Sequence, residues 1–203
     1  MVCTTKDLYK SVRRCPGVRV MPGIRPKFFF ISKAVILAWP TIPDVSAIKD
    51  PAELAEYVGN FTLQSDAKWH SVNLVDMKSN ISSETQGEAP SATILNKAEL
   101  VVGGTGKEIS GLCAQIINDE VIGLVQQRDG RVRVIGCEAY APKITAAQAS
   151  GSSATDSCTT TLSVEATDSA PCPFYPGKIE TEEGDISGAD GSVWVDKKEN
   201  GGS

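Results

Sequence analysis

The chain has 203 residues, of which 41% are hydrophobic, and its net charge is −5 at pH 7. This hydrophobic content excludes wholesale disorder, and the length suits one domain with ordered extensions or, at most, two small domains. A membrane span is not expected, because the most apolar window, 28–39, is short and is interrupted by Ser32 and Lys33. The charged start of the chain has no apolar segment typical of a secretory signal, so we expect the chain to be cytoplasmic when it is made.

Charge is distributed unevenly along the chain. Residues 1–33 contain eight Lys and Arg and one acidic residue. Residues 34–177 contain nine basic and 17 acidic residues, and residues 178–203 contain three basic and seven acidic residues. The sequence therefore predicts a basic, Pro-rich and extended N-terminal arm, 1–27, attached to an acidic body. Two interpretations stay open: the arm is solvated, or it docks on an acidic surface, either a neighbouring copy of the protein or nucleic acid.

The first predicted elements are a buried strand and a helix. Phe28–Ile31 is bulky enough for a strand that is buried on both faces. The helix is predicted over 51–58, because Asp50, Pro51 and Glu53 match the preferences of a helix N-terminus and Gly59 suits the position after its end. We expect Leu54 and Val58 to be its buried side chains.

The rest of the chain has the pattern of short strands. A polar loop is predicted over 76–90, and loops of this length are usually functional or mobile. Asp129-Gly130 predicts a tight hairpin with a type I′ turn. After Ile186 the composition predicts a partly free tail. Strands are predicted over 61–63, 69–75, 92–102, 112–117, 121–127, 131–135 and 159–164.

Seven to nine short strands with one short helix favour a mainly β fold. We expect an antiparallel β-sandwich or barrel with one short α-helix, an extended N-terminal arm and a polar C-terminal tail. The predicted limits are 1–27 for the arm, 28–186 for the body and 187–203 for a flexible tail.

No metal, cofactor or nucleotide site is predicted. The six cysteines contain no C-x-x-C pair and the chain has one histidine, which argues against a zinc ribbon or finger. Buried free thiols are expected, with a Cys158–Cys172 bridge as the weaker alternative. Gly103–Glu108 lacks the first glycine and the Ser/Thr of a phosphate-binding loop. The acidic run 179–185 lacks the spacing of a calcium loop, so we expect it to be solvated.

His70 is the only histidine, and we expect it to be a structural imidazole beside Trp69. Ser71 cannot act with it in a hydrolase triad, because adjacent residues of a strand point to opposite faces. The sequence therefore predicts a non-enzymatic protein that either binds a partner or serves as a structural subunit.

Four segments carry a resemblance to a known family. Arg131–Gly136, the Gly/Ser-rich stretch 150–156, the Thr-rich strand 159–164 and the aromatic exit 173–179 follow one another in an order that resembles the C-terminal half of bacteriophage tail tube proteins and related virion proteins. Upstream, the strands and polar loop between 61 and 102 are similar to the hairpin with an extended loop through which such subunits reach a neighbour.

The resemblance implies a non-enzymatic structural protein of the virion tail, made in the host bacterial cytoplasm. Such subunits form hexameric rings whose inner sheets close into a barrel, and the rings stack with other tail proteins into a channel for double-stranded DNA. DNA passes without specific binding, and an acidic body would keep phosphate from adhering. A basic arm that docks on the next ring would make the head-to-tail contact of a growing filament.

The candidate assembly residues form two groups, one in the arm and one in the polar loop. Three alternatives stay open: another virion component (a connector, tail terminator or head-decoration protein), a nucleic-acid-binding β-domain whose affinity depends on the arm, or an enzyme that uses His70 or a cysteine. The candidate residues are Arg13, Arg14, Arg19 and Arg25 in the arm, and Ser79, Asn80, Ile81, Glu84, Gln86 and Glu88 in the loop.

Overall fold

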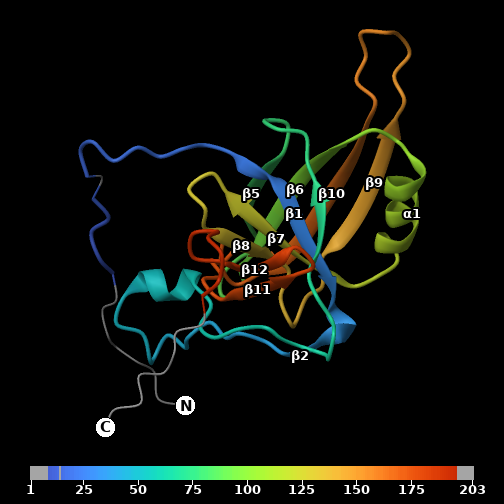
Figure 1. Cartoon of the computed structure of the whole chain (residues 1–203). Coiled ribbons are helices and arrows are strands. Elements are labelled where there is room, and N and C mark those ends of the chain that lie inside the picture. The colour runs from blue at the N-terminus through green and yellow to red at the C-terminus, as the bar shows by residue number, and fades with distance from the viewer. Residues whose placement is uncertain (1–8, 14, 196–203) are drawn as a thin grey trace.

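The computed structural model describes residues 9–13 and 15–195 (Figure 1). Within this part of the chain the fold is mainly β, with antiparallel sheets and a single α-helix, which confirms the predicted fold class. The helical elements are η1 (Lys33–Val35), η2 (Pro51–Ala55) and α1 (Lys107–Ile116). The strands are β1 (Ile24–Ser32), β2 (Ile36–Ala38), β3 (Thr62–Leu63), β4 (His70–Asn73), β5 (Asn80–Gln86), β6 (Thr93–Gly103), β7 (Val121–Gln127), β8 (Val132–Ile135), β9 (Lys143–Ala149), β10 (Thr159–Asp168), β11 (Lys178–Thr181) and β12 (Gly184–Ser187).

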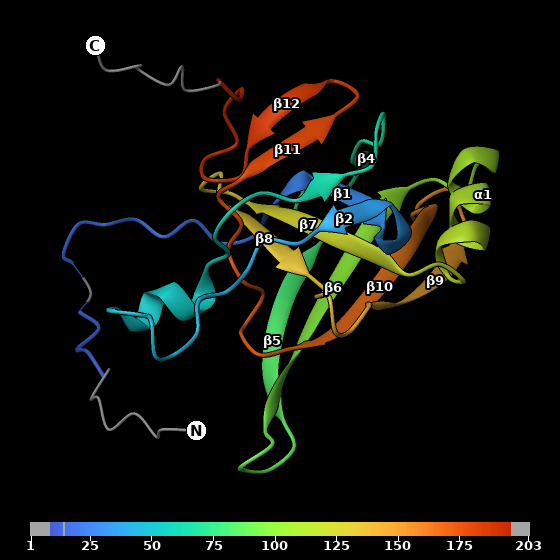
Figure 2. The ribbon, with the colours of Figure 1, turned by 90° about the horizontal axis from the view of Figure 1, so that it is seen from below.

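Two four-stranded sheets form the framework. The central sheet has the order β4-β1-β7-β8, and the long sheet has the order β5-β6-β10-β9. Two ribbons, β2-β3 and β11-β12, complete the strand pairing. Figure 2 shows β11-β12 on the side of the central sheet that faces away from the long sheet.

One hydrophobic core fills the space between the two large sheets. The central sheet contributes Phe28 and Val125, and the long sheet contributes Leu100 and Leu162. All four side chains are fully buried. Helix α1 seals this core by packing Cys113 and Ile116 against it, with Ile109 and Leu112 partly buried.

A second core lies on the opposite face of the central sheet. Phe29 and Leu124 point into it from the central sheet, and Trp69, Tyr175 and Ile179 cover them. The central sheet is therefore buried on both faces, as the apolar run of β7 requires. The prediction that the β1 segment is buried on both faces is confirmed, since Phe28, Phe29 and Ile31 are all buried.

The helix predicted over 51–58 is wrong in type and length. The expected capping box forms at Asp50 and Glu53, but the segment is a five-residue 3-10 helix with no buried side chain. Beyond it the backbone is used for strand-like pairing, because Tyr57 N–H donates to the Phe174 carbonyl and Val58 pairs with Thr41. Val58 is consequently 60% exposed.

The strand predicted over 112–117 is also wrong, because this segment belongs to α1. Its apolar residues, Ile109, Leu112, Cys113 and Ile116, recur at intervals of three and four positions, which is the period of one helix face. Gly106 provides the N-cap position without a side-chain cap.

The predicted polar loop over 76–90 contains a strand, β5, which takes up seven of its fifteen residues. Seven residues of β5 pair with β6 in regular antiparallel register. The strand is polar because it lies at a sheet edge and exposes most of its side chains. The connecting turn covers 87–92 and projects from the body (Figure 2).

The hairpin predicted at Asp129-Gly130 forms between β7 and β8, but its turn is not type I′. Only Gly130 has a positive φ, at 99°, whereas a type I′ turn needs two such residues. Gly130 N–H donates to the Gln127 carbonyl, and Gln127 N–H donates to the Arg131 carbonyl. The connection is therefore one of the longer hairpin loops that place glycine at the left-handed position.

Residues 187–195, which the sequence placed in a flexible tail, are hydrogen-bonded to the body. Val132 N–H donates to the Gly188 carbonyl at 2.8 Å, and Trp194 N–H donates to the Asp185 carbonyl at 2.9 Å. The remainder of the predicted tail, 196–203, lies outside the described residues.

Candidate functional site

The described part of the arm up to Gly23 lies outside the body as an extended, exposed segment (Figure 1). Arg13 and Arg19 are both exposed, as expected of residues available to a partner. Lys10 makes one ion pair with Asp50 of the same chain, at 2.8 Å. This contact shows that an acidic group on the body can hold a basic residue of the arm.

The arm also displays apolar side chains between its basic ones. Val12 is 100% exposed and Val20 is 85% exposed. If the arm docks, these side chains can be buried on a partner. The large exposed hydrophobic residues of the arm are Tyr9, Val12, Val18, Val20 and Met21.

Two arginines predicted for the arm interface, Arg25 and Arg14, do not belong to the exposed segment described above. Arg25 belongs to β1 and is half-buried, with its guanidinium group against the backbone of Gly130 and Gly191. Its placement in an extended arm is therefore wrong, because β1 already begins at Ile24. Arg14 lies outside the described residues.

The second group of predicted interface residues lies along β5 and its two ends. The Ser79 hydroxyl accepts a 2.9 Å hydrogen bond from Val101 N–H, and Glu84 forms a 2.6 Å ion pair with Lys97. Ile81 is partly buried and packs against the first core.

The other members of this group also have defined positions. The Gln86 amide donates to the hydroxyls of Thr93 and Thr167, at 3.2 and 2.8 Å. Asn80 and Glu88 are exposed, at the start of β5 and beyond its end. The predicted residues thus form part of an edge strand instead of a mobile loop.

The outer face of the long sheet is polar and almost neutral. Its residues follow from the strand registers, and all are exposed or half-buried. Three Glu and two Lys are the only charged members of this face. The face comprises Asn80, Ser82, Glu84, Gln86, Thr93, Leu95, Lys97, Glu99, Val101, Lys143, Thr145, Ala147, Ala149, Thr159, Thr161, Ser163, Glu165 and Thr167.

Both edges of the long sheet are open within the part of the chain that the structure describes. β5 pairs only with β6, and β9 pairs only with β10. Each edge strand has seven residues, and such strands present unpaired N–H and C=O groups to any strand that approaches. Strand β9 was not predicted, because its sequence, KITAAQA, combines small and polar residues with weak strand preference.

The hairpin of β9 and β10 ends in a projecting turn, visible at the top of Figure 1. The Asp156 carboxylate accepts hydrogen bonds from the backbone N–H groups of Ser152 and Ser153 at 2.8 and 2.9 Å. These bonds and those from the two hydroxyls lower the pKa of Asp156 to about 2. The Gly/Ser-rich connection in the sequence is therefore an ordered turn, and it provides a third exposed surface.

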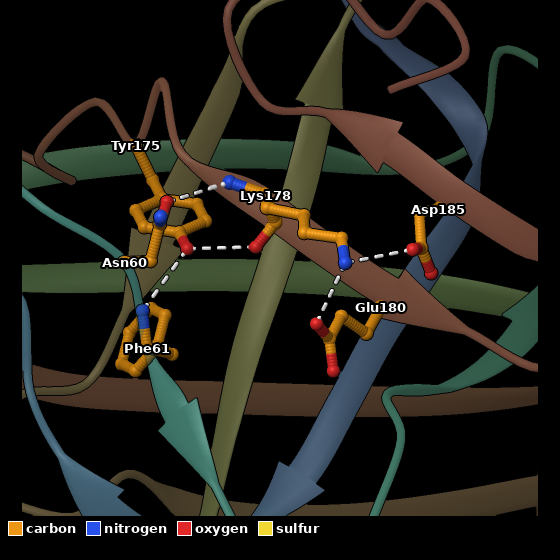
Figure 3. Close-up of polar contacts among 6 residues, drawn as sticks. All are labelled: Asn60, Phe61, Tyr175, Lys178, Glu180 and Asp185. Carbon is orange, nitrogen blue, oxygen red and sulfur yellow. Dashed lines mark hydrogen bonds and ion pairs between the residues drawn. The ribbon is translucent and has the colours of Figure 1, made fainter. Parts of the chain in front are cut away.

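A polar cluster around Tyr175 fastens the β11-β12 ribbon to the body (Figure 3). The Tyr175 hydroxyl accepts from Phe61 N–H at 3.1 Å and donates to the Lys178 carbonyl at 2.8 Å. Asn60 accepts from Lys178 N–H at 2.9 Å. Burial raises the pKa of Tyr175 to about 12, so the hydroxyl stays protonated and keeps its donor role.

Tyr175→Phe should lower the free energy of unfolding by about 1–3 kcal/mol, because it leaves a buried N–H and a carbonyl without their partner. Chemical denaturation monitored by circular dichroism would measure the loss. Tyr140→Phe is the matched control, since Tyr140 is 55% exposed, and it should change stability by less than about 0.5 kcal/mol. Equal effects of the two variants would contradict the structural role of the cluster.

Asp168 is a buried carboxylic acid at the end of β10, with 5% of its surface exposed. Its Oδ1 atom accepts a 2.6 Å hydrogen bond from Ser169 N–H, whereas Oδ2 has no partner among the described residues. Burial raises the pKa of Asp168, and the hydrogen bonds from Ser169 and Ala170 oppose the rise only in part. The titratable groups that interact with it are Tyr57, Cys137 and Cys172.

The raised pKa of Asp168 predicts a fall in stability with rising pH. Between the unfolded pKa, about 3.9, and the higher folded pKa, the folded chain binds more protons than the unfolded chain, so the free energy of unfolding decreases as pH rises. Asp168→Asn removes this contribution. The stability of the variant relative to wild type should therefore increase from about pH 4 to about pH 7. Urea denaturation at both pH values measures the difference, and a difference that stays constant would contradict the prediction.

His70 differs from its predicted surroundings, and the prediction of buried free thiols is confirmed for Cys113 and Cys172 but not for Cys15 and Cys158. The His70 side chain is 58% exposed, with Nδ1 3.5 Å from Glu182, so the prediction of a structural imidazole beside Trp69 is wrong. Cys113 and Cys172 are buried, whereas Cys15 and Cys158 are exposed, and the Cys158–Cys172 bridge does not form. Cys3 lies outside the described residues.

Among residues 9–13 and 15–195, no group of three or more His, Cys, Asp and Glu side chains is arranged to hold a metal ion. No helix in the same part of the chain is long and apolar enough to cross a membrane. No protein-family model, curated protein or solved structure matches the chain. The arguments for function therefore rest on the surfaces described above.

Proposed function

We propose that this protein is a non-enzymatic structural subunit of a bacteriophage virion, most specifically a tail tube subunit that assembles into stacked rings. The observation that carries the proposal is the long sheet, which ends on both sides in unpaired strands of equal length. Pairing of β5 of one copy with β9 of the next would continue the sheet from subunit to subunit. Repetition of one such head-to-tail contact closes a ring when the rotation between copies is suitable.

The outer face of the long sheet supports a channel for DNA. Its residues are mostly Ser, Thr, Asn, Gln and Ala, with one more Glu than Lys. A wall of this kind has no excess of basic side chains to hold phosphate groups, so duplex DNA would pass without specific binding. The opposite face of the same sheet covers the first core, so only the polar face is available to line a lumen.

The arm and the projecting hairpins are suited to contacts between rings. Arg13 and Arg19 are exposed on a segment that also presents apolar side chains. An arm that reaches the acidic body of a neighbouring ring would join rings without using the sheet edges. Sheet pairing would then build each ring, and the arm would link one ring to the next.

Adjacent proline substitutions in β9 test the sheet contact. Consecutive residues of an edge strand direct their N–H groups alternately toward the partner strand and toward the open edge. Of Ala146→Pro and Ala147→Pro, one should therefore lower Tm, while the other should keep the wild-type Tm and block assembly. Sedimentation velocity would report the size of the particles formed by each variant. Wild-type assembly by the variant that keeps its Tm would overturn the proposed ring contact.

One observation favours a second candidate function, a nucleic-acid-binding β-domain. Lys10, Arg13 and Arg19 are exposed on the arm and could neutralise phosphate groups. The test deletes residues 1–23, because β1 begins at Ile24. Affinity for DNA that falls steeply with salt and is lost on this deletion would support binding to nucleic acid, and negligible affinity would exclude it.

A further inference from the structure

The central sheet has an open edge at β4. Within the described chain β4 pairs only with β1, and beyond its end Leu74 N–H donates to the Pro26 carbonyl of β1 at 3.0 Å. Since N–H groups alternate in direction along an antiparallel strand, Ser71 and Asn73 direct theirs away from β1. Both residues are exposed. This open β4 edge is separate from the long-sheet edges proposed for the ring contact.

The backbone on either side of the open β4 edge already pairs with segments outside the central sheet. Before the edge, Trp69 N–H donates to the Glu180 carbonyl at 2.8 Å, and after it, Val75 N–H donates to the Val101 carbonyl at 2.7 Å. Trp69 and Val75 lie at alternate positions with the two open residues, so all four direct their N–H groups to the same side. The open β4 edge can therefore take an added strand of only a few residues.

A groove of about 930 Å³ lies beside this edge, between β4 and the first turns of α1. Part of its wall is apolar: two of these side chains are buried, and three are partly buried against the first core. An unpaired strand beside an apolar groove suits an extended segment that pairs through its backbone and inserts alternate side chains. The apolar wall consists of Leu74, Val102, Val72, Ile109 and Leu112.

The surroundings of this β4 groove carry an excess of acidic groups. A second pocket, of about 600 Å³, shares Ser71 and Leu112 with the groove and continues it along the sheet. Four of the charged residues that line the two hollows are acidic and two are lysines, which favours a basic partner. These residues are Asp66, Glu108, Asp119, Glu182, Lys68 and Lys107.

The arm has the charge and the pattern that the β4 groove requires. Residues 9–23 contain four basic residues and no acid. Val18 and Val20 are 59% and 85% exposed, and in an extended chain they lie on one side with Arg19 on the other. Pro22 limits the length of any strand formed here, in agreement with the short open edge.

The arm as described does not lie in the groove of its own chain. In Figure 1 it extends from the start of β1 on the side of the molecule away from α1, whereas α1 forms one wall of the groove. A second copy can bring its arm to this groove from outside.

We propose that the β4 groove receives residues 18–21 of the arm of another copy as a short added strand. The two valines would insert against α1, Arg19 would point toward Glu182 in the turn after β11, and the arm backbone would pair with the open β4 edge. The proposal rests on the proposed function in taking another copy as the partner, but it does not require rings or tubes.

Fluorescence anisotropy of a labelled peptide of residues 9–23 tests the groove. The receptor is the full-length protein with Val18→Asp and Val20→Asp, so that its own arms do not compete. We expect saturable binding, and at least about a tenfold loss of affinity when the peptide carries Val20→Asp. Val12→Asp in the peptide is the matched control, because Val12 is 100% exposed and lies outside the added strand, and it should cost about threefold or less.

Asn73→Pro in the same receptor tests the backbone pairing. The substitution removes an N–H that points away from β1, so Tm should not change while the peptide affinity falls by at least about tenfold. If Tm falls, Ser71→Pro replaces it, because Ser71 provides the other outward N–H. Equal losses for the Val12→Asp and Val20→Asp peptides, unchanged binding to a proline variant that keeps its Tm, or no binding at millimolar peptide would each overturn the groove as the arm site.

Sedimentation velocity identifies which copy supplies the arm. The wild-type protein should form larger particles than the Val18→Asp/Val20→Asp variant, because the contact joins copies. Particles of equal size, with peptide binding intact, would mean that each arm occupies its own groove, which would overturn the contact between copies. Since peptide binding needs no ring, the groove can be confirmed where tube assembly fails, and tubes that form without peptide binding would overturn the groove alone.

Discussion

Trp69→Ala is expected to lower the free energy of unfolding by about 3–5 kcal/mol, the largest loss among the substitutions considered for this chain. Trp69 is 1% exposed and lies in the second core, where its ring meets Phe61 edge to face at a centroid distance of 5.4 Å. The backbone N–H of Trp69, which the substitution retains, donates to the Glu180 carbonyl at 2.8 Å, so the loss comes from the ring alone. Removal of the ring leaves a cavity beneath the β11-β12 ribbon that rigid strands cannot fill.

Trp39 provides a matched control for this prediction. It meets the same Phe61 ring edge to face, also at 5.4 Å, but it is only half-buried. Trp39→Ala should therefore cost less than half as much as Trp69→Ala, because the two substitutions remove the same ring contact but different buried areas. Urea denaturation of both variants measures the difference, and equal losses would contradict the position of Trp69 in the core.

Gly188→Ala is expected to lower the free energy of unfolding by about 3 kcal/mol, at the upper end of the cost of overpacking. A Cβ atom at this position would overlap the Tyr175 carbonyl oxygen and lie 3.1 Å from the Gly177 carbonyl oxygen. Both obstacles are backbone atoms, so no side-chain rotation relieves them. Gly188 also donates its N–H to the Gly177 carbonyl and accepts from Val132 N–H, which ties three segments together.

Gly111→Ala is the control for the glycine substitution. Gly111 is exposed on α1, and no atom beyond the adjacent residues and the helix backbone lies within 4 Å of the added Cβ. The substitution should raise the free energy of unfolding by about 0.5–1 kcal/mol, since alanine is the better helix former. Thermal denaturation of the two variants compares them directly. A Gly188→Ala protein as stable as the wild type would mean that the segment after Ser187 is not held against the body.

The central part of the fold was predictable because its strands bury regular apolar patterns. The long apolar run of β1, the hairpin of β7 and β8 and the alternation in β10 all correspond to strands of the structure. In these segments local preference and burial favour the same conformation. The type of turn at Asp129-Gly130 was not predictable, because the same dipeptide serves several hairpin loops.

The peripheral elements were missed because tertiary contacts decide them. β5 and β9 are polar or small-residue strands that owe their conformation to pairing with β6 and β10. The segment 187–195 is rich in Gly, Asp and Ser, and only its bonds to β8 and to neighbouring turns fix it. Helix α1 was also missed, but it could have been predicted, because its apolar residues recur in the sequence with the period of one helix face.

The candidate site was predictable only in outline. The basic arm was found from charge, and its exposed part agrees with that prediction at Arg13 and Arg19. The open edges of the long sheet could not be derived from the sequence, because strand order is a property of the folded chain. Asp168 was not singled out either, since nothing in its local sequence indicates that the carboxylate is buried.

The most direct test of self-assembly is negative-stain electron microscopy of the purified full-length chain across a concentration series. We predict rings or stacked hollow tubes whose number rises with protein concentration and whose lumen is wide enough for duplex DNA. Monodisperse monomers at the highest concentration would contradict assembly through the edges of the long sheet.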